Sequence, residues 1–166
     1  MLVDVGADAN KQNKDGWTAL MMAAEHGGEH GAGMMRLLVD AGADANKQDN
    51  GGRTALMMAA EHGSDHAEAM MRLLVDAGAD ANKQSKSGWT ALMEAAQDGS
   101  EHGAGMVRLL VDAGANVNEQ DEFGSTALMF ALLDAGADTN KQDGYGWTAL
   151  ALAARCVGKH LSLIHI

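Results

Sequence analysis

Hydrophobic and polar positions recur along the chain in blocks that return every 36 residues. The segments 16–51 and 52–87 are identical at 27 of 36 aligned positions. The run Gly-x-Thr-Ala-Leu begins at Gly16, Gly52, Gly88 and Gly124. A period of this length is typical of stacked supersecondary units, so we expect a repeat solenoid with an extended binding surface.

Each unit predicts two short helices. Thr18 precedes an apolar run and suits the start of a helix, because its hydroxyl can accept a hydrogen bond from a free N–H of the first turn. Gly27 is expected to end this helix after about two turns. The spacing of apolar residues predicts a second helix over 34–41 that ends at Gly42, with its buried face at positions 34, 37, 38 and 41.

A turn-rich segment links one unit to the next, and we call it the finger. In 42–52 it is dominated by Gly, Asn and Asp, which tolerate positive φ and hydrogen-bond to their own backbone. Neither helix can bury its apolar face alone. We therefore expect the units to be stable only as a stack.

Two stretches of the unit resemble the ankyrin repeats. Residues 18–24 read Thr-Ala-Leu-Met-Met-Ala-Ala where that family has Thr-Pro-Leu-His-x-Ala-Ala, and 37–46 match its Leu-Leu-Leu-x-x-Gly-Ala-Asp-x-Asn. The resemblance covers 1–155. It implies a mainly α ankyrin solenoid of helix-turn-helix units joined by turn or β-hairpin fingers. Ala and Met replace the Pro and His of the signature, so we expect the family's Thr–His hydrogen bonding between repeats to be absent.

Each complete unit is three residues longer than the 33 of the family. The distance between the finger glycines is constant, which places the insertion between the two helices, in 28–33 of the first unit. We expect a longer loop or one extra turn on the second helix.

The periodicity divides the chain into seven segments. A partial repeat is followed by three full ones, a fourth repeat shortened by 14 residues, a second partial repeat and a non-repeat tail: 1–15, 16–51, 52–87, 88–123, 124–145, 146–160 and 161–166. The shortening is either natural decay or an assembly error between similar repeats. Stacking should weaken after Gly124, with 125–160 fraying first.

The tail 161–166, Leu-Ser-Leu-Ile-His-Ile, matches no part of the repeat. It is the translation of a transposon mosaic-end adapter used in sequencing libraries, and we interpret it as such. The alternative is a natural apolar tail. On the adapter interpretation the chain is a fragment of a longer protein.

Composition narrows the choice of partner. The formal net charge of −11 and the absence of a basic stripe argue against nucleic acid and favour a protein with a basic surface. Cys156 is the single cysteine, which suits a reducing compartment. No apolar run approaches a membrane span and no signal peptide opens the chain. We expect an intracellular, cytoplasmic monomer that contacts no membrane.

The resemblance implies a set of partner-binding positions: the two residues before each finger glycine, the one after it, and the two after Ala-Ala. Trp, Tyr and Arg are enriched at interface hot spots, which favours a contact role for at least one of Trp17, Arg53 and Trp89. The alternative is that the tryptophans pack on the base of the finger. The candidates are Lys14, Asp15, Trp17, Glu25, His26, Asn50, Arg53, Glu61, His62, Lys86, Trp89, Gln97, Asp98, Phe123, Tyr145 and Trp147.

Histidine and carboxylate side chains lie close together in 25–30 and again in 61–66, which raises zinc binding as a further hypothesis. Glycines between them should prevent a shared helix face, and no cysteine accompanies them. We therefore expect no metal site, no catalytic residue and no cofactor. We expect no unit to place a polar residue at an otherwise apolar core position, which also argues against catalysis.

The sequence thus predicts a non-enzymatic scaffold or adaptor that binds a partner protein on the concave face of its fingers and first helices. One alternative is the targeting array of a larger enzyme, such as a kinase or a ubiquitin ligase, whose catalytic domain lies outside this chain. Another is a structural spacer.

Overall fold

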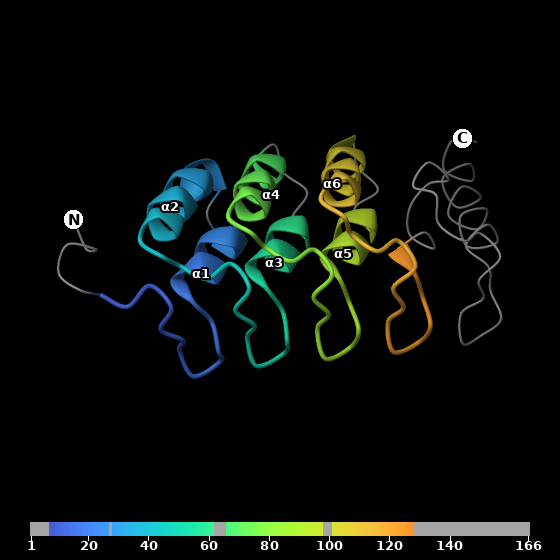
Figure 1. Cartoon of the computed structure of the whole chain (residues 1–166), viewed down its shortest axis with the longest axis horizontal. Helices are drawn as coiled ribbons and strands as arrows, with labels where there is room; N and C mark the ends of the chain where they lie inside the picture. The colour runs from blue at the N-terminus through green and yellow to red at the C-terminus, as the bar shows by residue number, and fades with distance from the viewer. Residues whose placement is uncertain (1–6, 27, 62–65, 98–100, 128–166) are drawn as a thin grey trace, which may run out of the picture.

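Three pairs of antiparallel helices stack side by side in the computed structural model (Figure 1). The structure describes residues 7–26, 28–61, 66–97 and 101–127. Fingers link successive pairs and project to one side of them. In chain order the helices are α1 (Ala19–His26), α2 (Gly28–Asp40), α3 (Ala55–Glu61), α4 (Ala67–Asp76), α5 (Ala91–Gln97) and α6 (Glu101–Asp112).

The first helix of each pair begins as the sequence predicts. The Thr18 hydroxyl accepts a hydrogen bond from the backbone N–H of Met21 at 3.2 Å, and Thr54 and Thr90 repeat this contact. Met21 stands where the family signature has histidine, and its side chain is 1% exposed. The backbone N–H of Thr18 in turn lies 3.4 Å from the Met21 sulfur. A buried thioether has therefore replaced the imidazole at this position.

The second helices begin earlier than the apolar pattern predicts. The helix α2 starts at Gly28 and runs for 13 residues, so the expected extra turn of the second helix is confirmed. Among the glycines of α2, Gly31 is the one where packing requires a small residue, since a Cβ on Gly28 or Gly33 would meet no atom within 4 Å. A Cβ on Gly31 would lie 2.6 Å from the Met70 sulfur, so the missing side chain lets α4 approach α2 closely.

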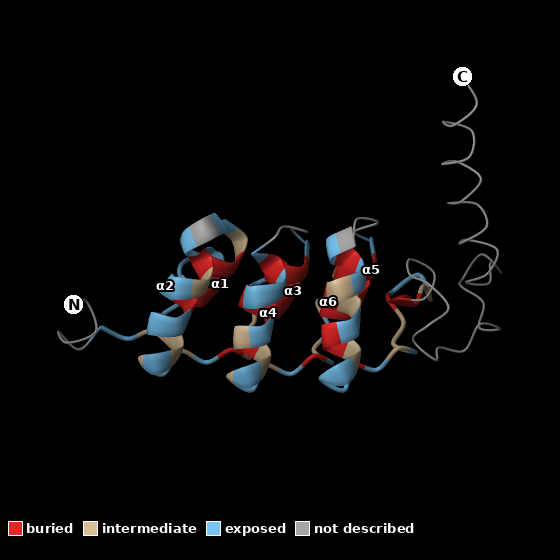
Figure 2. Ribbon diagram, turned by 90° about the horizontal axis from the view of Figure 1, so that it is seen from above, coloured by how far each residue is buried: buried red, intermediate tan, exposed pale blue. Residues whose placement is uncertain are grey.

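The core lies between the two helix layers and along α1, α3 and α5, as the red segments of Figure 2 show. The predicted buried face of the second helix is partly wrong. Met34 is 45% exposed and Leu37 is 48% exposed, whereas Met35 is fully buried. In the third pair the equivalent residues Met106 and Leu109 are 0% and 7% exposed. The periodicity correctly located an apolar stripe on the second helix. This stripe is covered by the preceding helix pair, and because no described pair precedes α1 and α2, Met34 and Leu37 remain exposed.

The fingers are built from turns, one of the two forms expected for them. In the described residues the β-type pairing is one isolated bridge between Gln120 and Thr126. Gly16, Gly52 and Gly88 have φ of 80° to 82°. A Cβ on Gly16 would lie 2.6 Å from the backbone nitrogen of Asn50 in the next finger. Glycine is therefore needed here both for its positive φ and for the close approach of the fingers.

Side-chain amides join the fingers into a ladder. Asn46 donates to the carbonyl of Gly78 at 2.8 Å and accepts from the backbone N–H of Asp80 at 2.7 Å. Asn10 and Asn82 make the same pair of bonds to their following fingers. A second row of amides, such as Gln48 to the Gln84 carbonyl at 3.0 Å, runs beside the first. These bonds hold the repeats together where the family's Thr–His contact is absent.

Among the described helices, none is both long and apolar enough to cross a membrane. The predictions for Gly27, for most of the shortened repeat 124–145, for the fraying of 125–160 and for the tail 161–166 lie outside the described residues.

Candidate protein-binding face

The chain leaves each of the four described fingers in the same geometry, and this geometry positions one variable side chain per repeat. We call the first residue after each finger glycine the exit residue. Its backbone N–H donates a hydrogen bond to the side chain of the residue four positions before it. Asp49 accepts from Arg53 at 2.8 Å, and Asp121 accepts from Ser125 at 2.8 Å. Asn13 and Ser85 do the same for Trp17 and Trp89. The side chains at 17, 53, 89 and 125 therefore form one row across the stack.

Trp17 and Trp89 occupy the first and third described places of this row. Both are partly buried and pack against the hydrophobic core. The indole of Trp17 also meets the His26 imidazole edge to face, with ring centroids 6.3 Å apart. Neither tryptophan is fully buried, so part of each residue is accessible to solvent.

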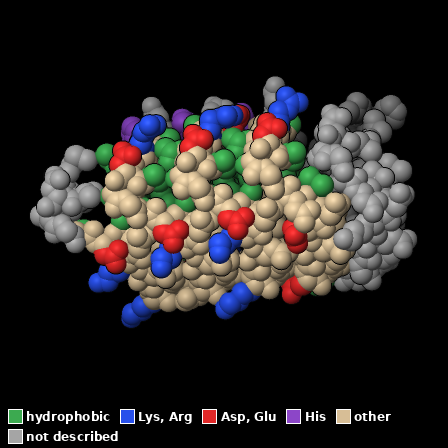
Figure 3. All heavy atoms as spheres, viewed as in Figure 1, with side chains coloured by type: hydrophobic (Ala, Val, Ile, Leu, Met, Phe, Trp, Pro, Cys, Tyr) green, Lys and Arg blue, Asp and Glu red, His purple; other side chains and the backbone are tan. Residues whose placement is uncertain are grey.

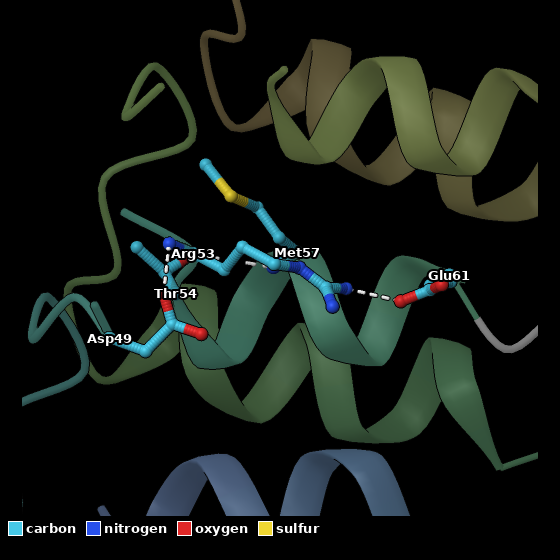
Figure 4. A network of polar contacts seen from close by, with 5 residues as sticks. All are labelled: Asp49, Arg53, Thr54, Met57 and Glu61. Atoms are coloured by element: carbon cyan, nitrogen blue, oxygen red, sulfur yellow. Dashed lines mark hydrogen bonds and ion pairs between the residues drawn. The ribbon is translucent and has the colours of Figure 1, made fainter. Parts of the chain in front are cut away.

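Arg53 lies between the two tryptophans and extends along α3, where its guanidinium forms a charge-assisted hydrogen bond with the Glu61 carboxylate (Figure 4). The Arg53 side chain is 28% exposed and that of Glu61 is 41% exposed. This ion pair connects the finger exit to the last turn of its own first helix.

Further carboxylates surround this arginine. Burial lowers the pKa of Arg53, but the hydrogen bond to Glu61 and the charges of Glu61, Glu94 and Glu25 outweigh that effect, and the pKa is raised overall. Three carboxylates from three successive repeats thus act on one guanidinium. We call Trp17, Arg53, Trp89 and these three carboxylates the finger–helix face.

Glu94 was missed by the sequence reasoning, which found no polar residue at an apolar core position. That statement is wrong: Glu94 is the equivalent of Met58, whose side chain is fully buried. The exchange of Met for Glu in the third copy was the available signal. Glu94 is only partly buried, and its charge acts on Arg53 across the junction of α3 and α5.

Backbone bonds bring four other predicted residues together at the finger tips. The Asn50 backbone N–H donates to the Asp15 carbonyl at 3.0 Å, and its side chain donates to the Lys14 carbonyl at 2.9 Å. In the next finger, the backbone N–H of Lys86 donates a hydrogen bond to the Gly51 carbonyl at 2.8 Å. All four predicted side chains, at 14, 15, 50 and 86, are exposed.

The remaining predicted residues are separate from this arrangement or outside the description. Gln97 is exposed at the end of α5, and Phe123 is 53% exposed at the tip of the fourth finger. His62, Asp98, Tyr145 and Trp147 lie outside the described residues. Within 7–26, 28–61, 66–97 and 101–127 no three His, Cys, Asp or Glu side chains are grouped to hold a metal ion.

A comparison with protein families matches residues 1–84 and 64–135 to ankyrin repeats in three copies. The chain belongs to the ankyrin-repeat family. No curated protein matches it closely. Ankyrin repeats are generally protein–protein interaction modules, and no specific partner follows from the family alone.

The exit positions of the finger–helix face vary from unit to unit. The framework residues repeat from unit to unit, whereas the face changes from Trp17 to Arg53 to Trp89 and from Met58 to Glu94. A face that varies on a constant frame is suited to recognition, because its side chains can change without altering the stack.

Proposed function

We propose that this chain is a non-enzymatic, intracellular scaffold or adaptor that binds a partner protein on the finger–helix face. The observation that carries the proposal is the row of Trp17, Arg53 and Trp89, set among carboxylates contributed by three repeats. Partly exposed tryptophan provides large contact area with little loss of side-chain entropy, and Arg53 is already held by its ion pair with Glu61. A targeting array of a larger enzyme would use the same face, so both settings predict the same contacts.

The expected partner surface is basic. Glu25, Glu61 and Glu94 bring three formal negative charges to the centre of the face and Arg53 brings one positive charge, on a chain of net charge −11. Lys or Arg on a partner could pair with these carboxylates and stack on the exposed part of a tryptophan ring. The face lies within one chain, so a single copy is sufficient to bind.

A display library of random 12-residue peptides can test the face without a known partner. We expect binders selected on the wild-type chain to be enriched in Lys and Arg. Their affinity should fall at least about ten-fold in the double variant Trp17→Ala with Trp89→Ala. Circular dichroism and thermal unfolding verify that the variant is folded, and the pair Trp17→Leu with Trp89→Leu retains more of the apolar packing. Unchanged affinity in both folded variants would refute the assignment of the face.

Charge is tested separately with two matched variants. Arg53→Gln and Arg72→Gln each remove one positive charge and break one Arg–Glu pair, but Arg72 lies on α4 with Glu68, among the second helices. If the partner is basic, Arg53→Gln should tighten binding several-fold, and Arg72→Gln should have a smaller effect. Equal effects would show that only the net charge of the chain matters.

A further inference from the structure

The second helices α2 and α4 border an open groove of about 770 Å³. Its floor contains Val39 and Leu73, both partly buried, together with small residues of the two helices. Its rim carries Arg36 and Asp40 on α2 and Arg72 and Asp76 on α4, all exposed. Figure 3 shows acidic and basic side chains side by side over the helices, with hydrophobic side chains between them.

The next junction along the stack shows why this groove is open. Glu68 lies toward α6, with its carboxylate 2.9 Å from where a Cβ on Gly105 would be, and it pairs with Arg72 at 3.1 Å. Ala32 is the equivalent of Glu68 in the first unit. The shorter side chain leaves space between α2 and α4. It also leaves Arg36 without an ion pair among the residues that the structure describes.

The charges on the rim are self-complementary. Arg36 precedes Asp40 by one helical turn, and Arg72 precedes Asp76 in the same way. When two such surfaces meet in antiparallel orientation about a two-fold axis, each arginine faces an aspartate of the other copy. A parallel orientation would place like charges together. This is the pattern that an isologous contact requires, since each copy presents the same patch.

We propose that the α2–α4 surface binds a second copy of this chain in antiparallel orientation. The contact would cover Val39 and Leu73 in the groove. A net charge of −11 on each copy opposes association, but salt at physiological strength screens charges beyond about 8 Å. The dimer should therefore be weak and appear at physiological rather than low salt. The inference departs from the expectation of a monomer.

A consequence for the scaffold is bivalence. The groove lies among the second helices, whereas the finger–helix face is formed by the finger exits and first helices. A dimer through α2 and α4 would leave two finger–helix faces free, so a partner with two binding segments would gain avidity.

Charge complementation between two variants tests the proposal. In Arg36→Asp the contact would place acid against acid, and in Asp40→Arg it would place base against base. An equimolar mixture restores both opposite-charge pairs. Analytical ultracentrifugation should show a dimer for the wild type and the mixture, and dimerisation at least about ten-fold weaker for each variant alone. Lys11→Asp on the first finger, away from the second helices, makes the same change of charge at an exposed position and is the matched control; it should dimerise as the wild type does.

Two outcomes would overturn the proposal. The first is a wild-type chain that sediments as a monomer up to about 1 mM at physiological salt. The second is a dimer that Arg36→Asp and Lys11→Asp weaken equally, or that the mixture fails to restore, because the contact would then lie elsewhere. Circular dichroism of each variant excludes loss of fold as the cause, and these exposed positions leave the core intact.

Discussion

The first and second repeats present the same apolar side chains in opposite environments. Met22 and Met34 of the first repeat are 54% and 45% exposed, whereas their equivalents Met58 and Met70 in the second are 0% and 3% exposed. The local sequence around these residues is nearly identical. The difference shows that burial in this solenoid depends on the preceding helix pair and not on the residue or its own helix.

The largest effect should come from placing a charge at the two equivalent methionines. Met58→Glu would bury a carboxylate without a partner and should cost more than about 4 kcal/mol of unfolding free energy. Met22→Glu places the same carboxylate at an exposed position and should cost less than about 0.5 kcal/mol. Urea unfolding followed by circular dichroism measures both. Similar costs would show that the two positions do not differ in burial.

Two equivalent leucines give the next largest contrast. Leu109→Ala removes a side chain that is 7% exposed and should cost about 2–4 kcal/mol. Leu37→Ala removes one that is 48% exposed and should cost at most about 1 kcal/mol. Chemical denaturation of both variants at one temperature is sufficient. A large loss in Leu37→Ala would mean that the described surface of α2 is covered in solution.

The ladder between fingers makes a smaller contribution. Asn46→Ala removes two hydrogen bonds to the next finger and should cost about 1–2 kcal/mol. The neighbouring variant Lys47→Ala leaves those bonds in place and should change the stability by less than about 0.5 kcal/mol. Amide hydrogen exchange provides a second reading. Protection of the Asp80 N–H should fall in Asn46→Ala and persist in Lys47→Ala.

The smallest effect on stability is expected from the two arginine–glutamate pairs. Both pairs are partly exposed to solvent, so Arg53→Gln and Arg72→Gln should each cost less than about 1 kcal/mol. Their equal effect on folding is what makes them matched probes of binding. A cost in Arg53→Gln well above that in Arg72→Gln would indicate that the Arg53 pair supports the stack.

Much of the fold follows from local chemistry that the sequence displays. Thr18 caps a helix because its hydroxyl reaches the N–H of Met21, and Gly16 turns a finger because it alone accepts the required φ. These features depend on residues a few positions apart, so a single sequence is sufficient to predict them. The 36-residue period then predicts that the units stack.

The errors arose where a neighbouring repeat decides the outcome. The sequence left open whether the glycine-rich stretch from Gly28 forms a loop or an extra turn. It forms the first turns of α2, where Met70 of the next repeat packs close to Gly31. The periodicity identified the apolar stripe of the second helix. It could not show that a preceding helix pair has to cover this stripe, and so it did not predict that Met34 is exposed. For the binding face, the row of exit residues was predicted from the family resemblance. Glu94 could be assigned to the face only from the structure, in which its charge acts on Arg53 across the junction of α3 and α5.

The most direct test of the account is to map which face a partner contacts. In a ¹⁵N NMR titration with a selected peptide, the indole N–H signals of Trp17 and Trp89 and the side-chain N–H of Arg53 should shift together. The side-chain signals of Arg36, Arg72 and Arg108 on the second helices should not. Shifts confined to the second helices, with the two indole signals unchanged, would contradict recognition on the finger–helix face.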